Sequence, residues 1–212
     1  MSWWNSFVSF ISDGIDYFAH LTHDYGWAIL IVTLIIRLLT VPFFMKQIRY
    51  TKQMQALQPK MQKIREKHKN DKQKLQEETM KIFQEHNMNP LSGCFPILIQ
   101  MPILLALYRS IMQNEHIKHA KFLGVVNLGT PDPYYILPIL AAVLTYFQQK
   151  LMMTGNDQQQ KMLLVIYPVM ILFISLKFPA ALSLYWVFGT LFTIAQTYFT
   201  KTLPAKKEAT VK

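Results

Sequence analysis

The chain has 212 residues, of which 51% are hydrophobic and 16% are charged, and its formal net charge is +10. This composition argues against a single soluble core and favours a chain that lies in a membrane. The one cysteine excludes an intrachain disulfide and a cysteine-rich metal site, and the seven scattered glycines form no phosphate-binding loop.

We predict that residues 1–24 form an external amphipathic helix in the outer headgroup region. Asp13, Asp16 and Asn5 would face water, and aromatic side chains would anchor the helix in the interface. These anchors are Trp3, Phe7, Phe10, Tyr17 and Phe18. No basic flank or small-residue cleavage site accompanies this stretch, and we therefore expect a signal segment to precede it.

Residues 25–45 are predicted to form the first transmembrane helix, in which Arg37 is the only charge of the apolar run 27–44. A charge at this depth costs roughly 2.5 to 3.5 kcal/mol unless it faces protein, water or a counter-ion. Thr33, Arg37 and Thr40 lie on one stripe of the helix, and no other apolar run contains an Asp or Glu. Arg37 could snorkel to an interface. We favour a wet cavity in which it recognises an anionic group.

The segment 46–90 is predicted to be a basic cytoplasmic hairpin of two helices. Its net charge is +6, and apolar residues recur at helical spacing on both sides of a break at 68–71. Pro59 would bend or interrupt the first helix. The basic faces could contact anionic headgroups or ribosomal RNA, or they could simply be solvated. The candidate contact residues are Lys63, Lys67, Lys69 and Lys72.

Residues 91–200 are predicted to contain transmembrane helices two to five, followed by a basic cytoplasmic tail at 201–212. The four apolar runs lie at about 95–112, 134–152, 162–176 and 183–200. Lysine and arginine divide unequally between the two sides, with 17 on one and four on the other. This bias predicts an external amino terminus and a cytoplasmic carboxyl terminus.

Polar residues within the later runs predict a hydrophilic groove shared with the first helix. Trp186, Thr190 and Thr193 fall on one stripe of the last run. Hydrogen bonds between helices, typically under ~1 kcal/mol each, are the alternative explanation for such residues. The candidate substrate-binding residues are Arg37, Thr33, Thr40, Gln100, Trp186, Thr190, Thr193 and Gln196.

The sequence offers little for catalysis. The pairs His20 with His23 and His116 with His119 have a spacing that could share a metal, but exposed or interfacial histidines explain them more simply. No intramembrane His or Lys accompanies the serines at a spacing that suggests a protease. We therefore predict no enzyme activity, no catalytic residues, no cofactor and no bound metal.

Four motifs follow one another along the chain: LIIRLLTVP in the first run, NMNPLSGCFPILIQMPILLALY after the hairpin, then DPYYILPIL, and finally FPAALSLYWVFGTLFTIAQ. Their order resembles the YidC/Oxa1/Alb3 family of membrane protein insertases. The likeness extends from about residue 26 to residue 200 and is strongest to the five-span form of Gram-positive bacteria.

The resemblance implies an all-α polytopic membrane protein with five transmembrane helices around a hydrophilic groove in the inner leaflet, open to cytoplasm and lipid. The groove arginine, here Arg37 with Thr33 one turn earlier, would attract acidic residues of a substrate's translocated segment. Trp186 would lie on the substrate-facing last span.

The expected function is that of a membrane protein insertase and chaperone in the bacterial plasma membrane. The expected partners are nascent single-span and multi-span membrane proteins, membrane lipids, the ribosome and the Sec translocase, but not DNA.

Two other classes of protein also fit a basic residue in a membrane helix. A transporter or channel for a small anion would use Arg37 as its binding charge, and would usually contain an internal repeat, which we do not find convincingly here. A purely structural partner of another translocase would need no charge in a groove of its own.

Overall fold

The computed structural model describes residues 2–86, 88–89, 95–153 and 158–202. The structure is mostly helical, which confirms the predicted class. Its helices are α1 (Ser2–Thr22), α2 (Tyr25–Lys67), α3 (Lys72–Glu85), α4 (Phe95–Gln113), α5 (Glu115–His119), α6 (Ile136–Met152), α7 (Gln158–Lys177) and α8 (Ala180–Thr202). Two short antiparallel strands, β1 (Lys121–Phe122) and β2 (Val126–Asn127), join α5 to the loop before α6.

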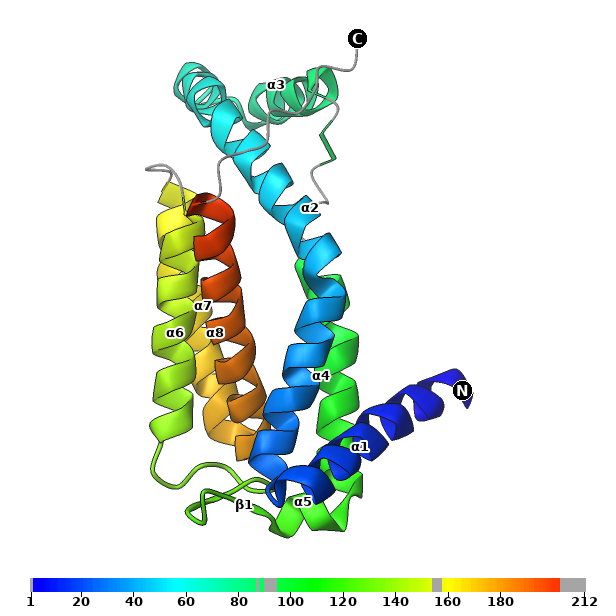
Figure 1. Ribbon diagram of the computed structural model, residues 1–212. Coiled ribbons are helices and arrows are strands. Elements are labelled where there is room, and N and C mark those ends of the chain that lie inside the picture. The colour runs from blue at the N-terminus through cyan, green and yellow to red at the C-terminus, as the bar shows by residue number, and fades with distance from the viewer. Residues whose placement is uncertain (1, 87, 90–94, 154–157, 203–212) are drawn as a thin grey trace.

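Five helices run roughly alongside one another, and each contains most or all of one apolar run of the sequence (Figure 1). These are α2, α4, α6, α7 and α8. Helix α1 crosses one end of this bundle, which we call the α5 end, and α3 lies beyond the opposite end, the α3 end. Among the described residues, α2 and α8 are long and apolar enough to cross a membrane, and α6 is a shorter apolar helix.

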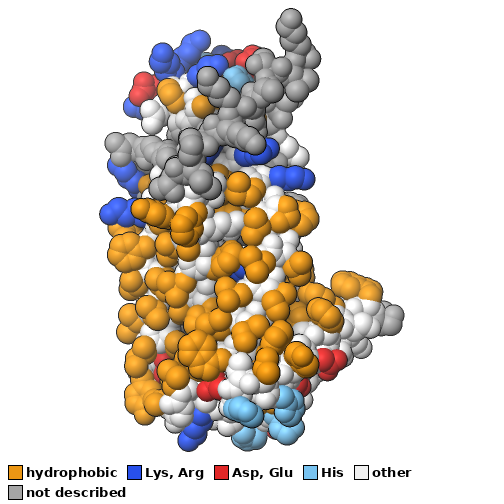
Figure 2. Space-filling view, in the orientation of Figure 1, with side chains coloured by type: hydrophobic (Ala, Val, Ile, Leu, Met, Phe, Trp, Pro, Cys, Tyr) orange, Lys and Arg blue, Asp and Glu red, His pale blue; other side chains and the backbone are white. Residues whose placement is uncertain are grey.

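The surface of the bundle is apolar along most of its length. Hydrophobic side chains cover the middle of the face in Figure 2, whereas Lys and Arg gather mainly toward the α3 end and His toward the α5 end. An apolar belt between two polar ends is the surface that a membrane-spanning bundle requires.

Helix α1 buries one face against α2 and α4 and exposes a second apolar stripe. Val8, Ile11 and Ile15 belong to the main core, whereas the side chains of Trp3 and Phe10 are 72% and 76% exposed. Asp13 and Asn5 are exposed as expected.

Asp16 differs from the prediction that it faces water, because it is half-buried and joins three helices. Its carboxylate accepts hydrogen bonds from Asn114 Nδ2 at 2.8 and 2.9 Å and from the Tyr25 hydroxyl at 3.1 Å. Asp16 therefore fastens α1 to the start of α2 and to the end of α4.

Helix α2 is a single element that contains both the predicted first transmembrane helix and the first helix of the hairpin. Asp24 caps it by accepting hydrogen bonds from the backbone N–H groups of Gly26 and Trp27. The helix continues through Pro42 and Pro59 to Lys67. Sequence reasoning expected Pro59 to bend or interrupt this helix; the helix is not interrupted there, and its last turns lie at an angle to the rest of α2 (Figure 1). Packing of apolar side chains on both sides of that proline offsets the loss of one backbone hydrogen bond.

Helix α3 folds back on the end of α2 over a small apolar cluster of its own. The buried members are Leu57, Ile82, Phe83 and Met88. Asp71 caps α3 by accepting a hydrogen bond from the Lys74 N–H at 3.0 Å. The rest of this helix pair is largely exposed, so few contacts fix α3 to the remainder of the chain.

Backbone hydrogen bonds close the bundle at the α5 end. The loop between β2 and α6 accepts hydrogen bonds from the first turn of α8, from Ala180 N–H to Thr130 C=O and from Ala181 N–H to Leu128 C=O. Asp132 is 2% exposed and accepts hydrogen bonds from the N–H groups of Tyr134 and Leu137. This loop thereby ties the starts of α6 and α8 together.

Candidate functional site

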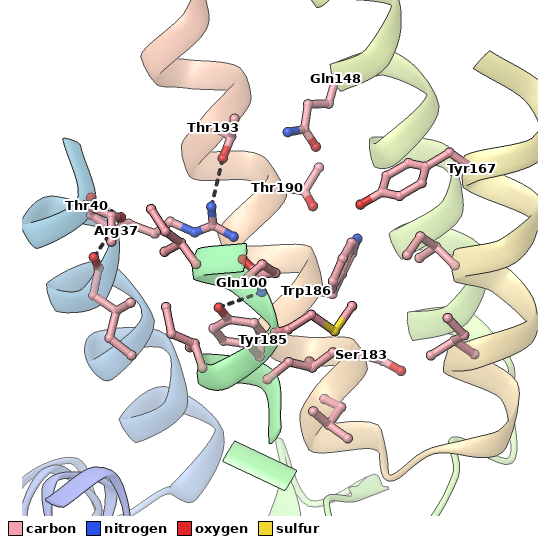
Figure 3. A pocket seen from close by; sticks show the side chains of 18 of the residues that line it. Arg37, Thr40, Gln100, Gln148, Tyr167, Ser183, Tyr185, Trp186, Thr190 and Thr193 are labelled. Carbon is pink, nitrogen blue, oxygen red and sulfur yellow. Dashed lines mark hydrogen bonds between the residues drawn. The ribbon is translucent and has the colours of Figure 1, made fainter. Parts of the chain in front are cut away.

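A cavity of about 430 Å³ lies among α2, α4, α6, α7 and α8 (Figure 3). Its wall is mostly apolar, with a few polar side chains that come from all five of these helices. The lining includes seven of the eight candidate groove residues, which are Arg37, Thr40, Gln100, Trp186, Thr190, Thr193 and Gln196. Helix packing therefore brings together polar side chains that are distant in the sequence.

Thr33, the eighth candidate, is not among the residues that line the cavity. It is buried, and its hydroxyl donates a hydrogen bond to the Ile29 carbonyl at 2.6 Å within the same helix. Neighbouring helices cover α2 around Thr33. The polar stripe of α2 therefore lines the cavity only at Arg37 and Thr40, which lie closer to the α3 end.

The Arg37 guanidinium projects from α2 toward α8 (Figure 3). Its Nη1 donates to the Thr193 hydroxyl over 3.4 Å, and its Nη2 lies against Gly189. Its Nε is buried without a hydrogen-bond partner. Within the described ranges no ion pair joins Arg37 to a carboxylate. The positive charge is therefore held in position but is not neutralised by a carboxylate of the described residues.

The threonine stripe of α8 stands opposite Arg37 and is buried. The Thr193 hydroxyl accepts from Arg37 while it donates to the Gly189 carbonyl at 2.8 Å, four residues earlier. Thr40 on α2 donates in the same way to Ile36. Because these hydroxyl protons are satisfied by the helix backbone, Thr193 presents an oxygen lone pair, not a proton, to the guanidinium.

Two glutamines add further hydrogen-bonding groups. Gln100 on α4 donates through Nε2 to the Tyr185 hydroxyl on α8 at 3.0 Å, and so joins these two helices across the cavity wall. Gln196 lies nearer the α3 end, and its Nε2 is buried without a hydrogen-bond partner. Among the described residues, the cavity lining thus has two buried donors without a hydrogen-bond partner, one on Arg37 and one on Gln196.

Trp186 forms an aromatic wall that is fixed by a hydrogen bond. Its indole Nε1 donates to the Thr145 hydroxyl at 3.1 Å, and its ring lies 6.5 Å from that of Tyr167. Thr145 is fully buried on α6. The hydrogen bond sets the orientation of the indole, whose remaining surface lines the cavity.

The candidate residues omitted several residues of the site, among them Gly189, Thr145 and Tyr185. Gly189 had a usable signal, since a glycine within an apolar helix often marks a close approach to another element. It precedes Thr193 by one turn and so lies on the same stripe. Thr145 had a signal as a polar residue within an apolar run, whereas Tyr185 had none, because its partner Gln100 comes from another helix.

The candidate hairpin lysines lie outside this cavity. Lys63, Lys67, Lys69 and Lys72 are exposed around the connection between α2 and α3. In the described part of the chain, no group of three or more His, Cys, Asp or Glu is arranged to hold a metal ion.

An apolar helical bundle with a half-buried arginine in a cavity among its helices fits the class of proteins that lie in a membrane. The model of the "60Kd inner membrane protein" family matches residues 17–208. The chain belongs to this family, the YidC/Oxa1 insertases. Its members are not enzymes, which confirms that prediction.

Individual relatives agree with this assignment. The chain is 53% identical to membrane protein insertase MisCA of Bacillus subtilis, over 96% of this chain and 81% of that protein. It is 50% identical to membrane protein insertase YidC 1 of Halalkalibacterium halodurans, over 93% of this chain and 78% of that protein. An active YidC insertase whose crystal structure resolves the first transmembrane domain matches with a TM-score of 0.78 at 30% identity, over 93% of this chain and 47% of that one.

Proposed function

We propose that this chain inserts nascent membrane proteins into the bacterial plasma membrane and helps them fold, with Arg37 as the electrostatic receptor for acidic residues of the translocated segment. The observation that carries the proposal is the Arg37 guanidinium, which lines the cavity and pairs with no described carboxylate. Family membership supports the general insertase function.

In the proposed topology α2, α4, α6, α7 and α8 are the five spans, α1 lies in the outer interface, and the α3 end is cytoplasmic. The excess of basic residues toward the α3 end supports this orientation. The hydrogen-bonded loop at the α5 end supports a groove that is closed on the outside. The groove would then open toward the cytoplasm and toward lipid.

Insertion would proceed without nucleotide or metal. The substrate meets the basic hairpin, its short polar flank enters the cavity near Arg37, and its apolar segment moves along Trp186 into lipid. Transfer of apolar side chains from water to hydrocarbon supplies about 0.8 kcal/mol per CH₂. The membrane potential adds about 2.3 kcal/mol per 100 mV for each acidic charge that is translocated.

Several partners follow from this mechanism. Nascent single-span and multi-span membrane proteins are the substrates, and membrane lipids surround the apolar belt. The exposed lysines near the connection between α2 and α3 are suited to the ribosome or to the Sec translocase.

The test is an insertion assay in reconstituted vesicles that combines Arg37→Ala with substrates carrying zero to three acids in the translocated flank. We expect the loss to grow with the number of acids and to reach about tenfold or more, because attraction in a low-dielectric groove exceeds that in water. Arg37→Lys should retain much of the activity. Arg49→Ala, which removes a charge from the same helix outside the cavity, is the control.

Equal loss across the substrate series would instead mean that Arg37 only keeps the cavity hydrated or folded. Saturable flux of a small anion through the vesicles, without any effect on insertion, would favour a transporter.

A further inference from the structure

Two buried donors of the cavity lining lack a partner among the described residues. Arg37 Nε and Gln196 Nε2 are both buried and unsatisfied, and the hydrogen bond from Arg37 Nη1 to the Thr193 hydroxyl is long at 3.4 Å. A buried donor without a partner costs about 1–3 kcal/mol, and an unpaired buried charge costs more. In the membrane, water or an anionic group that reaches these atoms between substrates would remove this cost.

The shape of the cavity indicates that this group belongs to an amphiphile. Polar groups that line it include Arg37, Gln100 and Thr190. Helices α4 and α7 also contribute apolar lining. Met101 and Leu105 of α4 and Met170 and Ile174 of α7 are at least 40% exposed. An occupant with an acceptor-rich anionic head and a hydrocarbon chain matches both the polar and the apolar lining.

The polar lining also continues from Arg37 toward the proposed cytoplasmic side. Arg37 lies nine residues from Lys46, or roughly 13 Å along the helix. Gln47, Gln148 and Gln196 line the cavity nearer the α3 end. A lipid headgroup that leaves the interface would therefore meet hydrogen-bonding side chains on its way to Arg37.

We propose that, between substrates, one membrane phospholipid occupies the cavity and acts as the counter-ion of Arg37. Its phosphodiester oxygens accept hydrogen bonds from Arg37 and Gln196, and one acyl chain lies between α4 and α7. Guanidinium and phosphate form strong charge-assisted hydrogen bonds. A substrate carboxylate would then replace this lipid, a step that rests on the proposed function. Insertion could therefore begin without leaving Arg37 unpaired at any stage.

The experiment is native mass spectrometry of the full chain released from vesicles of phosphatidylglycerol and phosphatidylcholine. We expect one phospholipid to be retained on the wild-type chain. Arg37→Gln should lower this occupancy about tenfold or more, because charge-assisted hydrogen bonds are lost. Arg49→Gln, which removes a charge from the same helix outside the cavity, should retain the lipid. Equal occupancy in the Arg37→Gln and wild-type chains would overturn the proposal.

Gln196→Leu keeps Arg37 in place and serves as a second variant should Arg37→Gln fail to fold. Its lipid occupancy should fall roughly two- to tenfold, and unchanged occupancy would contradict the proposal. Millimolar inorganic phosphate should not displace the lipid. Binding of phosphate without any retained lipid would show that the occupant is a free anion and overturn the lipid assignment.

Displacement of the bound lipid by a substrate peptide tests the lipid site independently of the role of Arg37 in insertion. A single-span peptide with an acidic flank should release the lipid, and the same peptide with a neutral flank should not. If no lipid is retained while insertion still depends on Arg37, the inference fails and the insertase mechanism stands. If the lipid is retained but insertion is independent of Arg37, the proposed role of the arginine fails instead.

Discussion

Gly189 of α8 provides the space in which the Arg37 guanidinium of α2 lies. A Cβ atom at Gly189 would meet Nη2 at closer than contact distance, and it would lie 3.0 Å from both Cζ and Nε. The guanidinium thus occupies the position that any other side chain at residue 189 would fill. The same turn of α8 supplies the Thr193 hydroxyl, so a few residues of one helix fix where the charge points.

Gly189→Ala should therefore displace the guanidinium while the charge remains in the chain. We expect insertion of substrates with acidic flanks to fall nearly as far as in Arg37→Ala. Thermal unfolding should change little, because alanine favours the helix by about 1 kcal/mol over glycine and so offsets part of the strain. Reconstituted insertion and an unfolding curve, measured on one preparation, check this.

Gly14→Ala is the matched control, because a Cβ at that position would meet only Val32 Cγ2 at an ordinary 4.0 Å. It should leave insertion unchanged. Full activity in Gly189→Ala would show that the position of the guanidinium does not matter.

The orientation of Trp186 should depend on Thr145. Thr145→Val removes the acceptor of the indole N–H at nearly constant volume, at a cost of about 1 kcal/mol. We expect greater mobility of the indole and a several-fold loss in insertion of apolar segments. Fluorescence anisotropy, with the other three tryptophans replaced by Phe, measures this mobility. Thr145→Ser retains the hydroxyl and should behave like the wild type; identical anisotropy in the Val and Ser variants would contradict the prediction.

Helix α3 should separate from α2 without unfolding of the bundle. Phe83→Ala removes a large member of the apolar cluster under α3, and truncation of such a residue in a core costs about 3–5 kcal/mol. Amide exchange should accelerate throughout α3 while exchange in α8 is unchanged. Even in the wild type, α3 amides should exchange faster than those of the spans, because the cluster is small. Met80→Ala, at a partly exposed position, is the control.

The connection between α2 and α3 should contribute to function more than to stability. Deletion of residues 67–72 should impair engagement of the substrate or the ribosome more than it impairs folding. The measurement pairs an insertion rate with a thermal unfolding curve. An unchanged rate would reject a role for Lys67, Lys69 and Lys72.

The helices of the bundle follow from the sequence because long apolar runs in a membrane chain have few alternatives to a helix. The run at 95–112, for example, corresponds to α4 at Phe95–Gln113. The continuation of α2 through Pro59 was harder to predict. It depends on packing against α3, and the residues around Pro59 do not reveal that packing. The same holds for Asp16, whose helical position predicts a solvent-facing carboxylate but whose partners Asn114 and Tyr25 come from other helices.

For the candidate site, the sequence identified charge and polarity but not contacts. Arg37 stands out because a lone charge in an apolar run is costly. Thr33 shares its helical stripe, yet that level of α2 is covered by other helices, and no helical wheel contains that information. Gly189 matters only because α2 and α8 pack closely at one level.

The loop between β2 and α6 should hold the bundle closed at the α5 end. Asp132 is buried at the start of α6, where its carboxylate accepts two backbone hydrogen bonds, and the same loop binds the first turn of α8. Asp132→Ala should leave the buried Leu137 N–H without a partner, at a cost of about 1–3 kcal/mol, and also remove the acceptor of the Tyr134 N–H. We expect faster amide exchange at 180–184 and measurable ion leakage from reconstituted vesicles. Asp13→Ala on the exposed face of α1 should cause neither effect. If Asp132→Ala vesicles leak ions no faster than wild-type vesicles and amide exchange at 180–184 is unchanged, this loop does not hold the α5 end closed.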